Sequence, residues 1–176
     1  MDEKVILVDN NDEILGYMNK LEAHKKGLLH RAISVFIFNK SNEMLLQRRS
    51  LVKYHTPGLW SNTACSHPRK NESVFEAANR RLSEEMGLTT DLIFGFKFTY
   101  KSNLNNDLIE NELDYVFYGF SNENPKINTS EVSEYSYLCE TEIDKLVSKN
   151  SDSFTPWFKL IYKKVFKILN NSKNVD

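Results

Sequence analysis

The run from Ile33 to Phe38 constrains the fold more than any other stretch of this sequence. It is almost continuously apolar and rich in β-branched and aromatic side chains, which is typical of a strand buried within a sheet. The turn formers at 39–42 then lead into a second predicted strand at 44–49. The chain is therefore expected to build its core around a β-sheet.

Similar runs predict further strands. Two short runs flank the turn formers Asp9 to Asp12, so the chain is expected to open with a hairpin. An asparagine-rich loop at 103–107 joins two longer runs in the second half of the chain. The additional predicted strands are 5–8, 14–17, 92–100 and 112–120.

The segment from Glu72 to Met86 has the spacing of an amphipathic helix. Its apolar positions, which form one stripe, are Phe75, Ala78, Leu82 and Met86. Gly87 is well placed to end the helix, because glycine adopts the left-handed conformation of a helix C-terminus at little cost. One face of this helix is therefore expected to be buried.

Three more helices are predicted. A short one at 19–26 stops at Gly27, and Thr141 can cap another that runs to Leu146. Thr155 and Pro156 are suited to begin the last helix, whose stripe is Trp157, Ile161, Val165 and Ile168. With no repeat and no linker, the sequence predicts one mixed α/β domain over residues 1–170 and a polar tail, 171–176, that frays.

The composition excludes several classes of function. The net charge is −1 at pH 7, so the basic surface typical of nucleic-acid binding is absent. The N-terminus is charged, and the longest apolar runs are too short to cross a bilayer, so no membrane partner is expected. Cys65 and Cys139 are expected to be free thiols in a reducing cytoplasm, with Cys139 in the core.

Cys65, Ser66 and His67 bring a thiol and an imidazole together in a loop rich in polar residues. A free cysteine is usually a small buried hydrophobe. Here the polar neighbours and an adjacent candidate metal ligand favour a thiol of lowered pKa that exchanges protons.

Three of the four histidines, His24, His30 and His67, stand where they can serve as metal ligands. Glu110 and Glu112 are two residues apart at a predicted strand, so both carboxylates face the same side. Imidazole and carboxylate together suit Zn²⁺, Mn²⁺ or Fe²⁺. The alternative is a solvated strand end with histidines at the surface or the edge of the core.

Charged side chains on the amphipathic helix have two interpretations. Arg81 precedes Glu84 and Glu85 by three and four positions, which is the spacing of intrahelical ion pairs. Glu85 also lies near the buried stripe and can instead bind a hard cation such as Mg²⁺.

Cations elsewhere are scattered along the chain. Some of them can clamp a phosphate group, although such residues more often form a solvated face; they are Lys20, Arg48, Arg49 and Lys53. His55 has no carboxylate near it in the sequence and is interpreted as structural.

The residues from His67 to Gly87 resemble the Nudix signature, a loop–helix–loop motif that binds metal and diphosphate. The matching positions are Glu72, Arg80, Leu82, Glu84, Glu85, Gly87 and Leu88. Two positions depart from it. Ser66 stands where the signature has glycine, and Arg81 stands where it has the first glutamate of an Arg-Glu pair.

These departures match one branch, because the chain resembles the type I isopentenyl-diphosphate isomerases over nearly its whole length. The segments that carry the resemblance are 30–38, 45–49, 53–60, 65–67 and 110–112. The resemblance implies a Nudix-type mixed sheet sandwiched between helices. It also implies the reversible conversion of isopentenyl diphosphate into dimethylallyl diphosphate through a tertiary carbocation.

The resemblance also implies roles for individual residues. Glu112, assisted by Tyr100, supplies the acid that protonates the alkene, and Cys65 lies on the opposite face as the base. Trp157 matches the aromatic residue that shields the cation, which agrees with the affinity of an indole face for positive charge. The implied contacts to the diphosphate are Lys20, Arg49, Lys53 and Ser66, with Arg81 beside them.

Two metal ions are implied as cofactors, and no flavin. One ion, Mn²⁺ or alternatively Zn²⁺ or Mg²⁺, is held by His24, His30, His67, Glu110 and Glu112. A second ion, Mg²⁺, bridges Glu85 and the diphosphate, with the Cys65 carbonyl nearby. The enzyme is expected to be a monomer or homodimer whose partner is a small isoprenoid diphosphate.

Two rival functions stay open at this point. A Nudix diphosphohydrolase is the first, and Arg81 argues against it because the Arg-Glu pair is lost. A non-catalytic binding module stabilised by metal is the second, and it leaves Cys65, Tyr100 and Glu112 without a shared role.

Overall fold

The computed structural model describes residues 3–53, 55–104 and 107–172. The first half of the chain contains β1 (Lys4–Val8), β2 (Ile14–Asn19), α1 (Lys20–Lys26), β3 (His30–Phe38), β4 (Met44–Arg49), β5 (Trp60–Ser61), β6 (Ala64–Ser66) and α2 (Val74–Met86). The second half contains β7 (Leu92–Asn103), β8 (Ile109–Phe120), β9 (Val132–Leu138), α3 (Glu140–Lys149), the short 3₁₀ helix η1 (Ser151–Ser153) and α4 (Pro156–Ser172).

The apolar run predicted to be a buried strand is β3, the centre of a mixed sheet. β8 runs parallel to it along its whole length, from the pair His30–Glu112 to the pair Phe38–Phe120. On the other edge, β3 pairs antiparallel with β6 and then with β4. Because β3 and β4 pair only at Ile37 and Phe38, the two strands diverge toward the start of β3.

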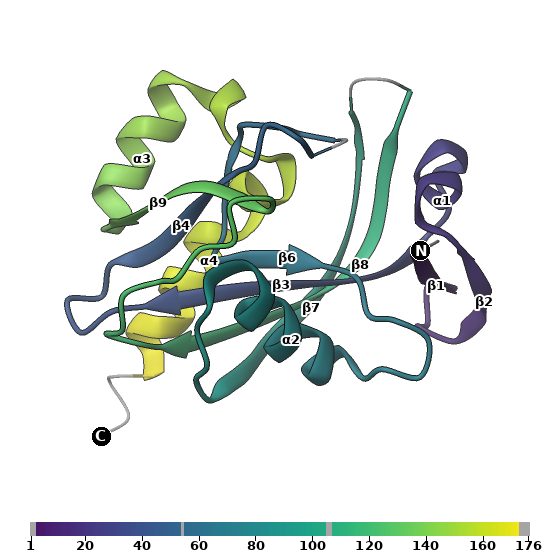
Figure 1. Cartoon of the computed structure of the whole chain (residues 1–176), viewed down its shortest axis with the longest axis horizontal. Helices are drawn as coiled ribbons and strands as arrows, with labels where there is room; N and C mark the ends of the chain where they lie inside the picture. Colours follow the sequence, from purple (N-terminus) through teal and green to yellow (C-terminus); the bar gives the residue numbers. More distant parts are fainter. Residues whose placement is uncertain (1–2, 54, 105–106, 173–176) are drawn as a thin grey trace.

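Helices cover both faces of this sheet, and Figure 1 shows α2 and α4 on opposite sides of it. The apolar side chains of β3 alternate between the two layers. Ile33, Val35 and Ile37 pack against α2, whereas Phe36 and Phe38 pack against α4. The predicted fold class, a mixed sheet sandwiched between helices in one domain, is confirmed.

The signature helix α2 begins and ends as its sequence requires. Ser73 accepts a hydrogen bond from the backbone of Glu76, and the Glu76 carboxylate accepts one in return from the backbone of Ser73. Gly87 ends the helix at a φ of 63°, and a Cβ there would lie 2.7 Å from the carbonyl oxygen of Lys126. Glycine is therefore required at this position both by conformation and by space.

The structure corrects four details of the sequence-based expectations. Phe75 is 48% exposed and contacts Phe117 at the margin of the core, while Ala77 takes its place in the buried stripe. Cys139, expected in the core, is instead the N-cap of α3, so Thr141 lies inside that helix. The last helix extends to Ser172, beyond the predicted boundary at 170, and residues 173–176 of the predicted tail lie outside the described residues.

Candidate active site

A cavity of about 330 Å³ opens where β3 and β4 diverge, and its volume is within the range of sites for small molecules. Most of the predicted site residues line it: Lys20, Arg49, Lys53, Cys65, Ser66, His67, Arg81, Glu110, Glu112 and Trp157. The remaining predicted site residues, His24, His30, Tyr100 and Glu85, are buried polar or aromatic residues that contact members of this lining.

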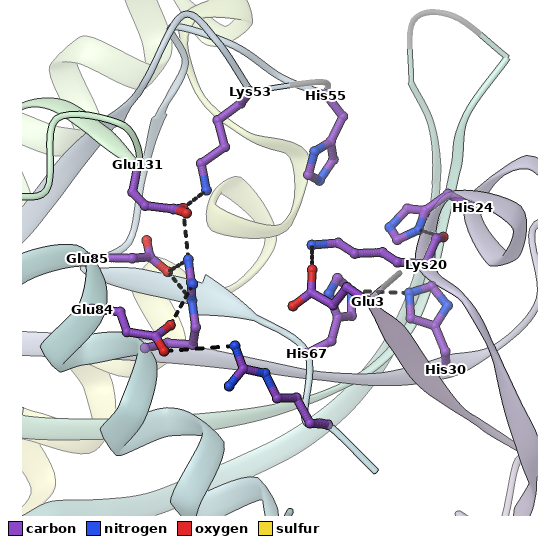
Figure 2. A network of polar contacts seen from close by, with 12 residues as sticks. Glu3, Lys20, His24, His30, Lys53, His55, His67, Glu84, Glu85 and Glu131 are labelled. Atoms are coloured by element: carbon purple, nitrogen blue, oxygen red, sulfur yellow. Dashed lines mark hydrogen bonds and ion pairs between the residues drawn. The ribbon is translucent and has the colours of Figure 1, made fainter. Parts of the chain in front are cut away.

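One end of the cavity is formed by the histidine cluster, which comprises His24, His30, His55, His67, Glu110 and Glu112. All six side chains are buried. β8 presents both carboxylates on one face, and β3 brings His30 directly opposite Glu112 in the strand register. Figure 2 shows the four imidazoles gathered here, with His24 from α1, His30 from β3, and His55 and His67 from the loops after β4 and β6.

The contacts in this cluster are close. His24 Nε2 lies 3.2 Å from Glu110 Oε2, and His67 Nε2 lies 2.8 Å from Glu112 Oε1. The Nε2 atoms of His30 and His67 are 3.2 Å apart. Potential ligand atoms of His24, His30, His67 and Glu112 all lie within 4.8 Å of one another, so one ion can reach all four.

The outer nitrogen atoms fix the tautomers of two imidazoles. His24 Nδ1 lies 2.7 Å from the carbonyl oxygen of Lys20, and His30 Nδ1 lies 2.8 Å from that of Leu28. A carbonyl only accepts, so each Nδ1 carries the proton in a neutral ring and each Nε2 offers a lone pair to the cluster. This arrangement is typical of histidines that bind metal, and the donor set fits a divalent cation.

The structure overturns the interpretation of His55 as a structural residue without a carboxylate partner. Its Nε2 lies 3.1 Å from Glu110 Oε1, and His24, His55 and Glu110 form a second group with metal-ligand geometry. The loop after β4 folds back over the cavity and brings His55 to a carboxylate 55 residues away in the chain. That distance in sequence is why no local signal revealed the contact.

Burial and charge set the protonation states in the cluster. Burial alone would raise the pKa of Glu110, but hydrogen bonds with His24 and His55 hold it well below its usual range. Burial lowers the pKa of His55 to about 4 and that of His67 well below its ordinary value. Without metal, the cluster therefore contains an ionised Glu110 beside neutral rings at His55 and His67 at pH 7.

Tyr100 and Glu112 form a proton-holding pair beside these imidazoles. The Tyr100 hydroxyl donates to Glu112 Oε2 at 2.6 Å, while His67 contacts the other carboxylate oxygen. Burial, followed by the charges of nearby carboxylates, raises the pKa of Tyr100 well above 10. Burial and Glu110 would also raise the pKa of Glu112, but hydrogen bonds with His30 and His67 lower it below its ordinary value.

Cys65 approaches the cavity from the other edge of β3, where β6 pairs it with Ser34. The expected lowering of its pKa is wrong for the protein without substrate or metal, because burial raises the pKa of this thiol to about 11. Arg49 opposes that effect, since its Nη1 lies 3.5 Å from Sγ. At pH 7 the thiol is therefore protonated, and its thiolate form is favoured by Arg49.

Trp157, at the first turn of α4, completes this wall of the cavity. Its indole nitrogen donates to Asn62 Oδ1 at 3.1 Å, and the Arg49 guanidinium carbon lies 5.6 Å from the ring centre. Because the indole is held by a buried hydrogen bond, its π face is fixed beside the cavity.

The opposite end of the cavity is the cation cluster, which comprises Lys53, Arg81, Glu84, Glu85 and Glu131. Arg81 contacts one carboxylate oxygen of each of the three glutamates at 2.8–2.9 Å. Lys53 pairs with Glu131 as well, as Figure 2 shows, so both cations contact that carboxylate. These charges raise the pKa of Arg81 further above its ordinary value despite its burial.

Glu85, predicted to bind Mg²⁺, is satisfied by protein groups in this structure. Arg81 Nε donates to Oε1 at 3.0 Å, and the side-chain amide of Gln47 donates to Oε2 at 2.6 Å. The intrahelical ion pair and the helix position near the core are therefore both present. A cation at Glu85 would have to share a carboxylate with Arg81.

Two residues that sequence reasoning missed also contribute to the site. Glu131 lies in the connection before β9 and belongs to no motif that the sequence analysis identified. Asp114 accepts a hydrogen bond from the Ser34 hydroxyl at 2.7 Å, and burial raises its pKa well above the ordinary value. Asp114 continues the alternation of Glu110 and Glu112 on one face of β8, so the strand period alone was sufficient to find it.

The chain is similar to known proteins over most of its length. A family model described as the NUDIX domain matches residues 28–158. An isopentenyl-diphosphate Delta-isomerase of Pectobacterium atrosepticum is 49% identical over 92% of this chain and 90% of its own length. An enzyme of the same name from Aliivibrio fischeri is 43% identical over 98% of this chain and 99% of its own length.

The chain belongs to the isopentenyl-diphosphate Delta-isomerase branch of the Nudix family. Solved structures support the fold separately. A Deinococcus radiodurans crystal structure aligns with a TM-score of 0.70 at 18% identity, covering 84% of this chain and 90% of that one. A MutT protein from Methanosarcina mazei aligns with a TM-score of 0.62 at 22% identity, covering 81% and 95%.

Among the described residues, every helix is too short or too polar to cross a membrane.

Proposed function

We propose that this member of the family interconverts isopentenyl diphosphate and dimethylallyl diphosphate. The observation that carries the proposal is the placement of two proton carriers in one cavity, on strands that flank β3. Cys65 comes from β6 on one edge, and Glu112 with Tyr100 comes from β8 and β7 on the other. Moving a carbon–carbon double bond requires one group to give a proton and another to take one.

The reaction balances as two proton transfers. A proton from the side of Tyr100 and Glu112 adds to the terminal alkene carbon and leaves a tertiary carbocation. The base on the side of Cys65 then removes a proton from the neighbouring carbon, and its electron pair forms the new double bond. The thiol must be ionised to act as that base, so we assign Arg49 the role of stabilising the thiolate.

Trp157 and the charged residues have supporting roles in the proposal. The indole face beside the cavity stabilises the developing cation and excludes water from it. Lys20, Arg49, Lys53 and Arg81 supply positive charge for the diphosphate, and Ser66 can add a hydrogen bond. The hydrocarbon part of the substrate then lies between Cys65 and Glu112.

We assign one divalent cation, Mn²⁺ or alternatively Zn²⁺ or Mg²⁺, to the histidine cluster. His24, His30, His67, Glu110 and Glu112 would hold it, with His55 as an additional ligand that only the structure suggested. Such an ion supplies positive charge that fixes the Glu112 carboxylate and increases the acidity of groups around it. A Mg²⁺ ion at Glu85 with the substrate diphosphate is the second assignment.

The test is to incubate the protein and divalent metal with isopentenyl diphosphate in heavy water. The proposal predicts dimethylallyl diphosphate that carries solvent deuterium in a methyl group, with no release of phosphate. Release of phosphate or diphosphate without the isomer would instead identify a Nudix hydrolase. Unchanged substrate would contradict both activities.

A further inference from the structure

The cations assigned to the diphosphate already hold a carboxylate in the absence of substrate. Glu131 Oε2 accepts a hydrogen bond from Arg81 Nη2 at 2.8 Å and another from Lys53 Nζ. It also lines the cavity, as do both of those cations. One side-chain anion therefore lies where a phosphate oxygen would have to bridge the same two residues.

Glu131 differs from the other two carboxylates that contact Arg81. The described residues that line the cavity include Glu131 but neither Glu84 nor Glu85. Glu84 and Glu85 follow Arg81 by three and four residues, about one helical turn, so they orient it from within α2. Glu131 reaches it from 50 residues away, across the cavity wall.

The backbone of Glu131 is held by hydrogen bonds that do not involve its carboxylate. Its carbonyl accepts from Ser50 N at 3.0 Å, and its own N–H donates to the Asn128 carbonyl at 2.9 Å. The side chain is 26% exposed, and its hydrogen bonds from Lys53, with the charge of Arg81, lower its pKa although burial opposes this. The carboxylate can therefore rotate toward solvent while the backbone before β9 stays in place.

We propose that Glu131 is a resident counter-anion of the diphosphate subsite, which the incoming diphosphate must displace from Lys53 and Arg81. This inference rests on the proposed function for the identity of the substrate, but not for the binding of a diphosphate group. In the empty site Glu131 keeps two cations apart and oriented. On substrate binding it gives up both contacts, and it recovers them when product leaves. Glu131 therefore limits the affinity of the site for the diphosphate group and shortens the lifetime of the product complex.

Glu3 provides a second, independent instance at the histidine end of the cavity. It lines the cavity and accepts a hydrogen bond from Lys20 Nζ at 3.2 Å, as Figure 2 shows. Lys20 is another predicted diphosphate contact. Lys20, Lys53 and Arg81 are thus each paired with a carboxylate that has no role in the Nudix signature.

The test compares Glu131→Gln with Glu134→Gln in the full chain. Both substitutions remove one negative charge from the same segment, but Glu134 pairs with Arg48 on the surface and does not line the cavity. The probe is inorganic diphosphate with Mg²⁺, measured by calorimetry. Glu131→Gln should bind the probe about tenfold more tightly than the parent, because a like charge is removed from the subsite. Glu134→Gln should stay within about twofold.

Equal affinities of the two variants, or weaker binding by Glu131→Gln, would overturn the inference and make Glu131 a fixed support of Lys53 and Arg81. If Glu131→Gln does not fold, a crystal structure of the parent with diphosphate decides instead. The Glu131 carboxylate should then lie beyond hydrogen-bonding distance of Lys53. Retention of both contacts would count against displacement. Because the probe is inorganic, these results do not depend on whether isomerisation occurs.

Discussion

The histidine cluster and the cation cluster are both built from charged or polar side chains, yet they differ in how those charges are paired. In the histidine cluster, several ligand atoms face one another in a buried space and fit an additional positive ion. In the cation cluster, Lys53 and Arg81 already have carboxylate partners, and Glu131, which pairs with both, is partly exposed. The first end offers ligand atoms to a cation, and in the second each cation is already paired with a carboxylate.

This difference separates two tasks within one cavity. Proton transfer at carbon requires groups fixed to within a fraction of an ångström, and burial of the histidine cluster provides that rigidity. Binding and release of a diphosphate require charges that can exchange one anion for another, and the more exposed cation cluster permits this. The predicted losses of activity that test this division run from the largest to the smallest, and a prediction about stability follows them.

Removal of metal should have the largest effect, because it acts on the histidine cluster. Chelation is expected to reduce turnover by at least about 10³-fold and to lower the melting temperature by roughly 5–15 °C, since an ion that binds only the folded state stabilises it. Addition of Mn²⁺ or Mg²⁺ should restore both quantities in activity and thermal-unfolding measurements. Full turnover in the presence of chelator would contradict a role for metal in the reaction.

Replacement of the thiol should come next. Cys65→Ser is expected to fold normally and to lose about 10²–10³-fold in kcat with little change in KM, because a serine hydroxyl ionises far less readily than a thiol. Cys139→Ser is the matched control, since that thiol lies at the start of α3, and its kcat should be unchanged. Steady-state kinetics of both variants check this. Parental kcat in Cys65→Ser would show that the sulfur only packs.

Loss of one hydroxyl should have a smaller effect. Tyr100→Phe removes the hydrogen bond to Glu112 and leaves the ring in place, so kcat should fall about 10- to 100-fold while stability changes by about 1 kcal/mol. Tyr162→Phe removes a comparable bond to Asp144, between α4 and α3. It should leave kcat unchanged, and a similar loss of activity in both variants would contradict a specific role for Tyr100.

The last prediction concerns the free energy of unfolding without metal and not turnover. Since burial lowers the folded-state pKa of His55 to about 4, the unfolded chain gains a proton below pH 6.5 that the folded chain does not. Stability should therefore fall between pH 6.5 and pH 4, by about 3 kcal/mol from this residue. Urea unfolding in chelator at pH 7 and pH 4.5 measures the loss. His55→Asn should flatten the pH dependence, and an unchanged slope would contradict the burial of a neutral ring.

The fold was largely predictable because its elements are marked locally. The apolar run of β3, the stripe of α2 and the proline that begins α4 each define an element from within a few residues. The errors fell where tertiary contacts override such signals. Phe75 has the spacing of a core residue, but it lies at the margin of the helix–sheet contact. Cys139 follows an apolar pair, yet the chain turns there into α3.

The site was predictable where residue types recur with a known period and not where distant segments meet. Glu110 and Glu112 were placed together by the two-residue period of a strand. The contacts of His55 with Glu110 and of Glu131 with Arg81 join segments 55 and 50 residues apart, so nothing local indicates them. The pKa of Cys65 was missed for a related reason, because its burial depends on elements that pack around β6.

The division of labour between the two clusters is tested most directly by measuring affinity and single-turnover rate in the same two variants. Glu112→Gln alters the histidine cluster, and Lys53→Met alters the cation cluster. The account predicts that Glu112→Gln slows a single turnover by about 10³-fold with substrate Kd within threefold of the parent. Lys53→Met should weaken Kd about tenfold and leave the rate within threefold. Variants that change both quantities together, to similar extents, would contradict the separation of chemistry from binding.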